Sequence, residues 1–181
     1  MSKVYILLAN GFEEIEGLMV VDLMRRAGID IKMVSITDSL DITGARGIGV
    51  KADITLKEAG DDADMVVLPG GMPGTLNLGL CQPLMEQIHK FNAAGKGLAA
   101  ICAAPTVFGK AGLLQGKKAT CYPGMEGDLQ GAIVSTDEVC HDGHIITSRG
   151  MGTAIPFALE IVKTFKGEEV SNNLAKSIVY K

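Results

Sequence analysis

The stretch Gly97-Leu98-Ala99-Ala100-Ile101-Cys102-Ala103-Ala104-Pro105 decides the fold expected for this chain. Its first five residues are apolar and short enough for a buried strand, and Pro105 suits the first turn of a helix. Cys102 is therefore expected at a sharp strand-to-helix turn, beside free backbone N–H groups and the positive end of a helix dipole. Such surroundings favour the thiolate, the reactive form of cysteine. The alternative is a small buried core residue, which is what most free cysteines are.

The segments around this turn repeat an alternation of strand and helix. Strands are expected at residues 4–9, 31–36, 65–68, 97–101, 138–141 and 144–148, and helices at 16–26, 83–93 and 153–165. Glycines interrupt residues 42–54, which are expected to form an irregular hairpin. Strands that alternate with helices of ten or more residues pair in parallel, with helices on both faces. We expect one α/β domain over residues 1–181 with a mostly parallel central sheet.

Composition excludes several classes of protein and partner. The chain has 181 residues, a net charge of −4 and dispersed basic residues, so neither nucleic acid nor a membrane surface is expected as a partner. The first apolar run ends at Asn10, too short for a signal peptide or a membrane span. The cysteines are far apart and form no C-x-x-C pair, which is typical of free thiols in the reducing cytoplasm: Cys81, Cys102, Cys121 and Cys140.

Three loops that follow strands contain residues suited to chemistry. In an open parallel sheet the active crevice lies at the carboxyl ends of the strands. The first strand leads into residues 10–16, the 65–68 strand into the turn Pro69–Gly74, and the 97–101 strand into Cys102. Glu16, Gly71 and Cys102 are therefore expected to meet at one edge of the sheet.

Two kinds of group are expected to assist the thiol. Glu13 and Glu14 are interpreted as acids that complement a helix dipole. Glu16 lies between apolar neighbours and is expected to point inward, where desolvation and the nearby negative charge keep it protonated. The backbone N–H groups of Gly71 and Ala103 are expected to form an oxyanion pocket, although the glycine pair before Met72 also serves simply to allow a turn.

Other motifs do not support a function. Residues 47–52 match a loose G-x-G-x-x-A dinucleotide pattern, but no helix follows, and the chain has neither a phosphate loop nor a G-x-S-x-G serine elbow. His141 and His144 would face each other across a hairpin, but a structural metal site normally has four ligands. We expect no metal and no cofactor.

Four ordered segments together resemble the ThiJ/PfpI superfamily, and the nearest branch is the parkinsonism-associated deglycase and its bacterial relatives. The resemblance extends over nearly the whole chain and rests on residues 10–16, 67–71, 100–105 and 147–153. It implies a flavodoxin-like three-layer α/β/α sandwich and a homodimer. It also implies an oxidisable reactive cysteine at Cys102, a carboxylic-acid partner at Glu16, backbone donors at Gly71 and Ala103, and a pocket-lining arginine at Arg46.

The sequence departs from the family pattern at one position that matters. The deglycase branch often carries a histidine before the proline that here is Pro123, and this chain has Tyr122 instead. Peptidase-like members place a histidine directly after the cysteine, where this chain has Ala103. A Cys-His protease is therefore not expected, and proton transfer falls to Glu16, to water or to Tyr122.

Two functions of different classes are compatible with these residues. The first is a cysteine-dependent enzyme of the glyoxalase or deglycase type, in which Cys102 attacks a small reactive carbonyl such as methylglyoxal, or its adducts on glycated substrates. The second is a redox sensor or redox-regulated chaperone in which Cys102 oxidises to sulfinic acid. An old family label adds a third, synthesis of a thiamine precursor, but no residue pattern here recognises a thiazole phosphate.

Overall fold

A seven-stranded sheet forms the centre of the molecule in the computed structural model, which describes residues 2–180. The strand order is β10-β11-β7-β6-β1-β2-β5, and every neighbouring pair is parallel except β10 with β11. The expected mostly parallel sheet is confirmed. Its strands are β1 (Lys3–Leu8), β2 (Asp30–Ser35), β5 (Ile54–Thr55), β6 (Met65–Leu68), β7 (Gly97–Ile101), β10 (Val139–Asp142) and β11 (Ile145–Ser148).

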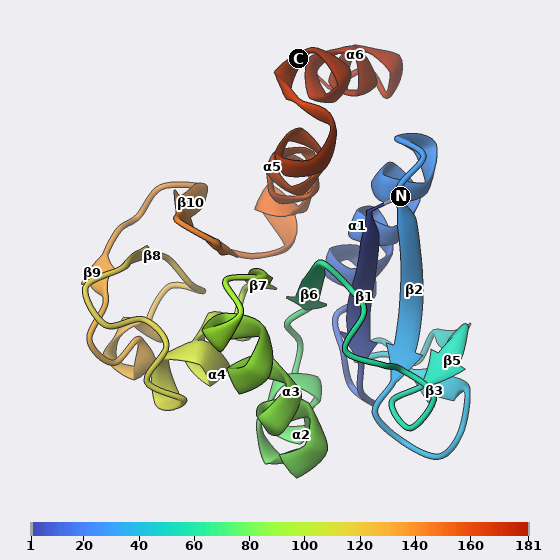
Figure 1. Ribbon diagram of the computed structural model, residues 1–181, viewed down its shortest axis with the longest axis vertical. Helices are drawn as coiled ribbons and strands as arrows, with labels where there is room; N and C mark the ends of the chain where they lie inside the picture. Colours follow the sequence, from blue (N-terminus) through green and yellow to red (C-terminus); the bar gives the residue numbers. More distant parts are fainter. Residues whose placement is uncertain (1, 181) are drawn as a thin grey trace.

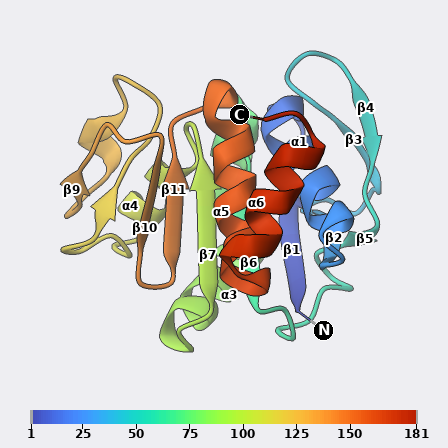
Figure 2. The same cartoon turned by 90° about the horizontal axis from the view of Figure 1, so that it is seen from above.

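Helices cover both faces of the sheet, as Figures 1 and 2 show. One face packs against α1 (Glu14–Arg26), α5 (Ala154–Lys166) and α6 (Glu168–Ser177). The other packs against α2 (Gly74–Leu80), α3 (Gln82–Ala93) and α4 (Pro105–Lys110). Alternate residues of β1 supply the two apolar clusters, because successive side chains of a strand point to opposite faces. The arrangement is the expected flavodoxin-like α/β/α sandwich.

Smaller elements decorate this sandwich. The hairpin expected over residues 42–54 forms as the antiparallel pair β3 (Asp41–Thr43) and β4 (Gly49–Lys51), but Ile54 lies outside it and pairs with Val34 at the edge of the central sheet. A second small sheet pairs β8 (Lys118–Ala119) with β9 (Ile133–Val134), and two 3-10 turns, η1 and η2, span Glu126–Asp128 and Met151–Thr153. No helix among residues 2–180 is both long and apolar enough to cross a membrane.

Two helices were absent from the sequence-based expectation. Helix α2 has only seven residues and contains two glycines, so its helical propensity is low. Helix α6 follows the helix that we expected to close the chain, and it buries only Ser171 and Leu174. Both helices form because a neighbouring surface is available for them to pack on, which local sequence does not reveal.

The register of the central strands determines which residues meet. Strands β7, β6 and β1 are adjacent and parallel, with Leu68 paired to Ala100. Two residues further on, Gly70 and Cys102 therefore leave the sheet at the same level. The chain crosses from one side of β1 to the other between β5 and β6, which is the switch point where open sheets form a crevice.

Candidate active site

Cys102 occupies the turn between β7 and α4, as expected from the sequence. Its backbone has a φ of 65°, in the left-handed region that residues with a side chain seldom adopt. Two backbone hydrogen bonds hold it there: the Cys102 N–H donates to the Ser148 carbonyl at 3.0 Å, and the Tyr122 N–H donates to the Cys102 carbonyl at 2.8 Å. Neighbouring segments on both sides thus impose a strained conformation on the residue that bears the thiol.

Glu16 lies in the first turn of α1 and points inward, with a residue exposure of 1%. Its Oε2 accepts the Gly70 N–H at 2.9 Å, and its carboxyl group lies beside the Cys102 side chain, close enough for each group to shift the pKa of the other. A Cβ atom on Gly70 would lie 2.6 Å from both the Cys102 Cβ and the Glu16 Oε2. Only glycine therefore allows the acid and the thiol to meet at this point.

Burial controls the protonation of this pair. It raises the pKa of Glu16 to about 7, and the charge of Glu13 adds to this effect. Burial, followed by the charge of the Glu16 carboxylate, raises the pKa of Cys102 to about 12. The Ala103 and Gly71 N–H groups lower the Cys102 pKa, as expected, but their effect is smaller than that of burial.

The expectation that the turn favours the thiolate was therefore wrong in its net direction. The backbone N–H groups and the helix dipole do favour a thiolate, but the cost of placing a charged sulfur in a buried site beside a carboxylate is larger. The protonated Glu16 expected from the sequence agrees in direction with its raised pKa. The two groups form a coupled pair, in which the carboxyl group titrates near neutral pH.

Gly71 needs a conformation and a space that only glycine provides. Its φ is 91°, and a Cβ atom there would lie 2.3 Å from the Glu13 backbone nitrogen. The Glu13 N–H in turn donates to the Gly70 carbonyl at 2.8 Å, which ties the two loops together. The Gly71 and Ala103 N–H groups face the Cys102 sulfur and lower its pKa, and both residues line the same pocket as the thiol.

One open pocket of about 470 Å³ brings together all six residues that the sequence singled out. The predicted members are Glu16, Arg46, Gly71, Cys102, Ala103 and Tyr122, and the additional ones are Glu13, Ala45, Met72, Met125 and Met151. Met72 and Met151 belong to segments already singled out by motif, but methionine carried no signal of its own. The three methionines give the pocket an adaptable apolar wall.

Tyr122 lies at the position where the family often has histidine, and its side chain is half exposed. A Cβ atom on Gly150 would lie 3.5 Å from the Tyr122 ring and 4.0 Å from the Cys102 Sγ. The ring and the sulfur therefore flank the same glycine. The tyrosine side chain forms a wall of the pocket next to the thiol.

Arg46 reaches the pocket from the turn between β3 and β4. Its side chain is 74% exposed, and its Nη2 lies 3.8 Å from the Glu13 Oε2, so this ion pair is weak. Glu14, interpreted from sequence as a helix-start acid, fixes this turn: its buried Oε1 accepts the Arg46 N–H at 2.8 Å and the Ile48 N–H at 3.4 Å. Only the contact between α1 and the hairpin, 32 residues apart, identifies this role.

The histidine pair lies away from the thiol and has other partners. The His141 Nδ1 lies 2.7 Å from the Glu160 Oε1, and the His144 Nε2 lies 2.8 Å from the Asn92 Oδ1. His144 precedes β11, whose residue Ile145 pairs with Leu98 near the start of β7, and Cys102 follows the end of that strand. Across the described residues, no group of three or more histidine, cysteine or acidic side chains could hold a metal ion.

Comparison with known proteins places this site in a family. The sequence pattern of the DJ-1/PfpI family matches residues 2–164. The chain is 37% identical over 181 residues to Protein DJ-1 homolog B of Arabidopsis thaliana, covering 98% of this chain and 41% of that protein, so it spans less than half of the plant relative. It is 31% identical over 180 residues to the glutathione-independent glyoxalase DJR-1.2 of Caenorhabditis elegans, covering 98% and 95% of the two chains.

A solved structure agrees with the sequence comparisons. The oxidized DJ-1 of Toxoplasma gondii superimposes with a TM-score of 0.96 at 34% identity, covering 99% of each chain. The fold, the elbow cysteine with its buried acid and the match over residues 2–164 all lead to the same assignment. This chain belongs to the DJ-1/PfpI family.

Proposed function

We propose that this protein is a stress-response enzyme of the glyoxalase or deglycase type, which acts on small reactive carbonyls such as methylglyoxal or their adducts. The observation that carries this proposal is the buried Glu16 carboxyl group, which lies beside the Cys102 side chain in one pocket and has a pKa of about 7. A group that titrates near neutral pH both accepts and returns a proton efficiently. The glyoxalase name of the Caenorhabditis elegans relative supports the choice of substrate.

The raised pKa of Cys102 sets the first step. Because the thiol is protonated at neutral pH, Glu16 as the carboxylate takes its proton while the sulfur bonds to the aldehyde carbon. Glu16 then returns the proton to the former carbonyl oxygen, which completes a hemithioacetal. The proton on the aldehyde carbon then moves to the neighbouring carbon, and the hydroxyl proton of the adduct moves to the former ketone oxygen, which gives a lactoyl thioester. Water hydrolyses the thioester, so methylglyoxal and water give lactate without an external oxidant or cofactor.

The other pocket residues take supporting roles in this proposal. The Gly71 and Ala103 N–H groups hold the developing oxyanion, since both already stabilise negative charge on the sulfur and lower its pKa. The Tyr122 hydroxyl is a second proton donor at the wall beside the thiol. Arg46, exposed at the pocket mouth, contacts the polar end of larger adducts.

Lactate production from methylglyoxal tests the enzymatic proposal. Cys102→Ala is expected to abolish lactate formation, whereas Cys81→Ala, at a half-buried cysteine between α2 and α3, retains the wild-type rate. Glu16→Gln is expected to lose most of the activity, since the amide accepts no proton at neutral pH. Equal lactate from Cys102→Ala and wild type would eliminate the mechanism.

A second function, a redox sensor or redox-regulated chaperone, is supported by a specific observation. A Glu16 carboxyl group that holds a proton near neutral pH can donate a short hydrogen bond to a sulfinate on Cys102. Mild peroxide is expected to add two oxygen atoms to Cys102, which lines the open pocket, and to leave Cys121 and Cys140 unmodified, because both are buried. Equal oxidation at all the cysteines would count against a tuned site.

We also propose the setting in which the protein works. The four cysteines are free, which suits the reducing cytoplasm. The chain is proposed to act as a single domain that pairs into a homodimer. Sedimentation equilibrium should then give twice the chain mass of 19.0 kDa, and a mass of one chain would refute the dimer.

A further inference from the structure

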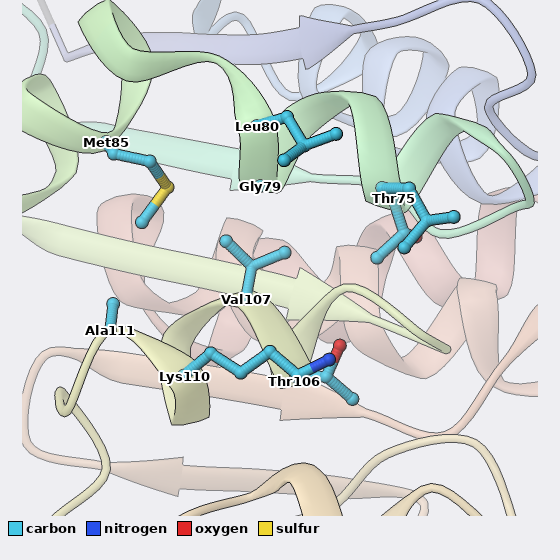
Figure 3. Close-up of a pocket in the computed structure, with 9 residues that line it drawn as sticks. Thr75, Gly79, Leu80, Met85, Thr106, Val107, Lys110 and Ala111 are labelled. Carbon is cyan, nitrogen blue, oxygen red and sulfur yellow. The ribbon is translucent and has the colours of Figure 1, made fainter.

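A second pocket lies on the α2, α3 and α4 side of the sheet and shares no lining residue with the Cys102 pocket. Its volume is about 300 Å³, at the small end of ligand pockets. Helices α2 and α4 form opposite walls, and α3 closes one end (Figure 3). The residues that line it are Thr75, Leu76, Gly79, Leu80, Met85, Thr106, Val107, Lys110 and Ala111.

The interior of this second pocket is apolar. Figure 3 shows Val107 of α4 pointing between Met85 and Leu80 on the facing helices. Leu80 is 81% exposed at the mouth, so a large apolar side chain contacts water where a ligand could cover it. A Cβ atom on Gly79 would contact only Val107, at 3.7 Å, so the missing side chain leaves part of the space open.

Three lining residues have polar side chains, and one of them, Thr106, already donates its hydroxyl to the Ala103 carbonyl. Lys110 is the single charged residue in the lining, and its Nζ lies 3.2 Å from the Asp128 Oδ2 with both side chains about half exposed. An exposed pair of this kind is weak, so the ammonium group remains available to a second anion. Thr75 is only 3% exposed, and its hydroxyl oxygen has no hydrogen-bond partner among residues 2–180. This hydroxyl is buried behind the wall, so Lys110 is the group through which the pocket can hold a polar end of a ligand.

We propose that this second pocket binds a small anionic amphiphile, namely a monocarboxylate with an unbranched apolar chain. The chain packs against Leu80, Met85 and Val107, and the carboxylate pairs with Lys110 at the rim. The lining contains Lys110 and no carboxylate side chain, and Asp128, which pairs with Lys110, lies outside it, so an anion that takes the place of Asp128 on Lys110 is favoured over a cation of the same shape. The proposal does not depend on the chemistry of Cys102, because the two pockets have no residue in common.

Calorimetric titration with octanoate tests the proposal, with octylammonium and 1-octanol as probes of the same chain. Octanoate is expected to bind saturably at one site per chain and more tightly than either control. Gly79→Leu, which fills the pocket without touching the Cys102 pocket, is expected to weaken octanoate by at least about tenfold, or about 1.4 kcal/mol. Lys110→Gln is expected to weaken octanoate by about threefold, as for an exposed charge, and to leave 1-octanol unchanged.

Controls separate this site from general surface binding. Lys176→Gln, which removes an exposed charge from α6 on the other face, is expected to bind octanoate like the wild type. Leu80→Gln provides a second variant at the pocket mouth, where exposure makes a folding defect small, and it should also weaken octanoate. The proposal is overturned if octanoate binds no tighter than octylammonium, or if Gly79→Leu and Leu80→Gln both retain wild-type affinity.

Discussion

The substitution Glu16→Gln tests the electrostatics of the candidate site most directly. It removes the charge beside the Cys102 sulfur while it keeps the volume of the side chain and an oxygen that can accept the Gly70 N–H. The carboxylate is one of the causes that raise the pKa of Cys102 from 9.0 to about 12. We therefore expect the pKa of Cys102 to fall in this variant.

The structure sets the size of the expected change. Two unit charges about 4 Å apart in a medium of effective dielectric constant about 20 interact by about 4 kcal/mol, which equals about 3 pKa units. The Cys102 pKa rises by a similar amount in total, from 9.0 to about 12, and burial is the largest cause of that rise. The contribution of Glu16 must be smaller, so we expect a fall of about 1 to 2 pKa units.

The assay is the alkylation rate of Cys102 by iodoacetamide between about pH 6 and pH 11, because the thiolate is the species that reacts. Mass measurement of the peptide that contains Cys102 separates its rate from those of the other cysteines. Glu13→Gln is the matched control, because the charge of Glu13 raises the pKa of Glu16 but is not among the causes that raise the pKa of Cys102. A Glu16→Gln profile that coincides with wild type, or moves to higher pH, would refute the argument.

Three further outcomes follow from the same site. The pKa of Glu16 is about 7 in the folded protein and 4.5 in an ordinary glutamate. The contribution of protonated Glu16 to the free energy of unfolding is therefore complete below pH 4.5 and is lost as the pH rises through 7. Between pH 4.5 and pH 7 the free energy of unfolding of the wild type should fall by up to about 3 kcal/mol relative to that of Glu16→Gln, as measured by urea unfolding at each pH. The free energy of unfolding of Cys102→Gly should be about 1 kcal/mol higher than that of Cys102→Ala in the same urea measurement, because glycine tolerates the positive φ at this position. Gly70→Ala should cost about 1 to 3 kcal/mol by calorimetry and slow methylglyoxal turnover, because its Cβ atom must displace Cys102 or Glu16.

The sequence predicted the parts of the site that depend on strand order. Glu16, Gly71 and Cys102 follow three strands whose apolar runs are strong signals, and the adjacency of β1, β6 and β7 brings these residues together. Only the family resemblance predicted that Arg46 lines the pocket, because the hydrophobic pattern of its hairpin gives no information about the site. These predictions succeeded because a parallel sheet aligns the ends of its strands.

The remaining features depend on contacts between distant segments. The pKa of Cys102 is set by burial, which the local sequence of the turn does not contain. Glu14 differs from Glu13 in function only because the β3–β4 turn folds over it. The short helix α2 has weak propensity and forms where the sheet and α4 offer a surface. Each of these features is determined by packing, and none leaves a pattern in its own neighbourhood.

The left-handed backbone at Cys102 has a consequence for how loss of activity should be interpreted. The Ser148 and Tyr122 hydrogen bonds already hold that conformation in the structure, so under the proposed mechanism the residue needs no further ordering before it reacts. Local opening that releases those two bonds would let the residue relax and turn its sulfur away from Glu16, while the rest of the sheet stays paired. Thiol reactivity therefore reports the integrity of the elbow, and it should disappear in partly opened molecules that still count as folded by global measures.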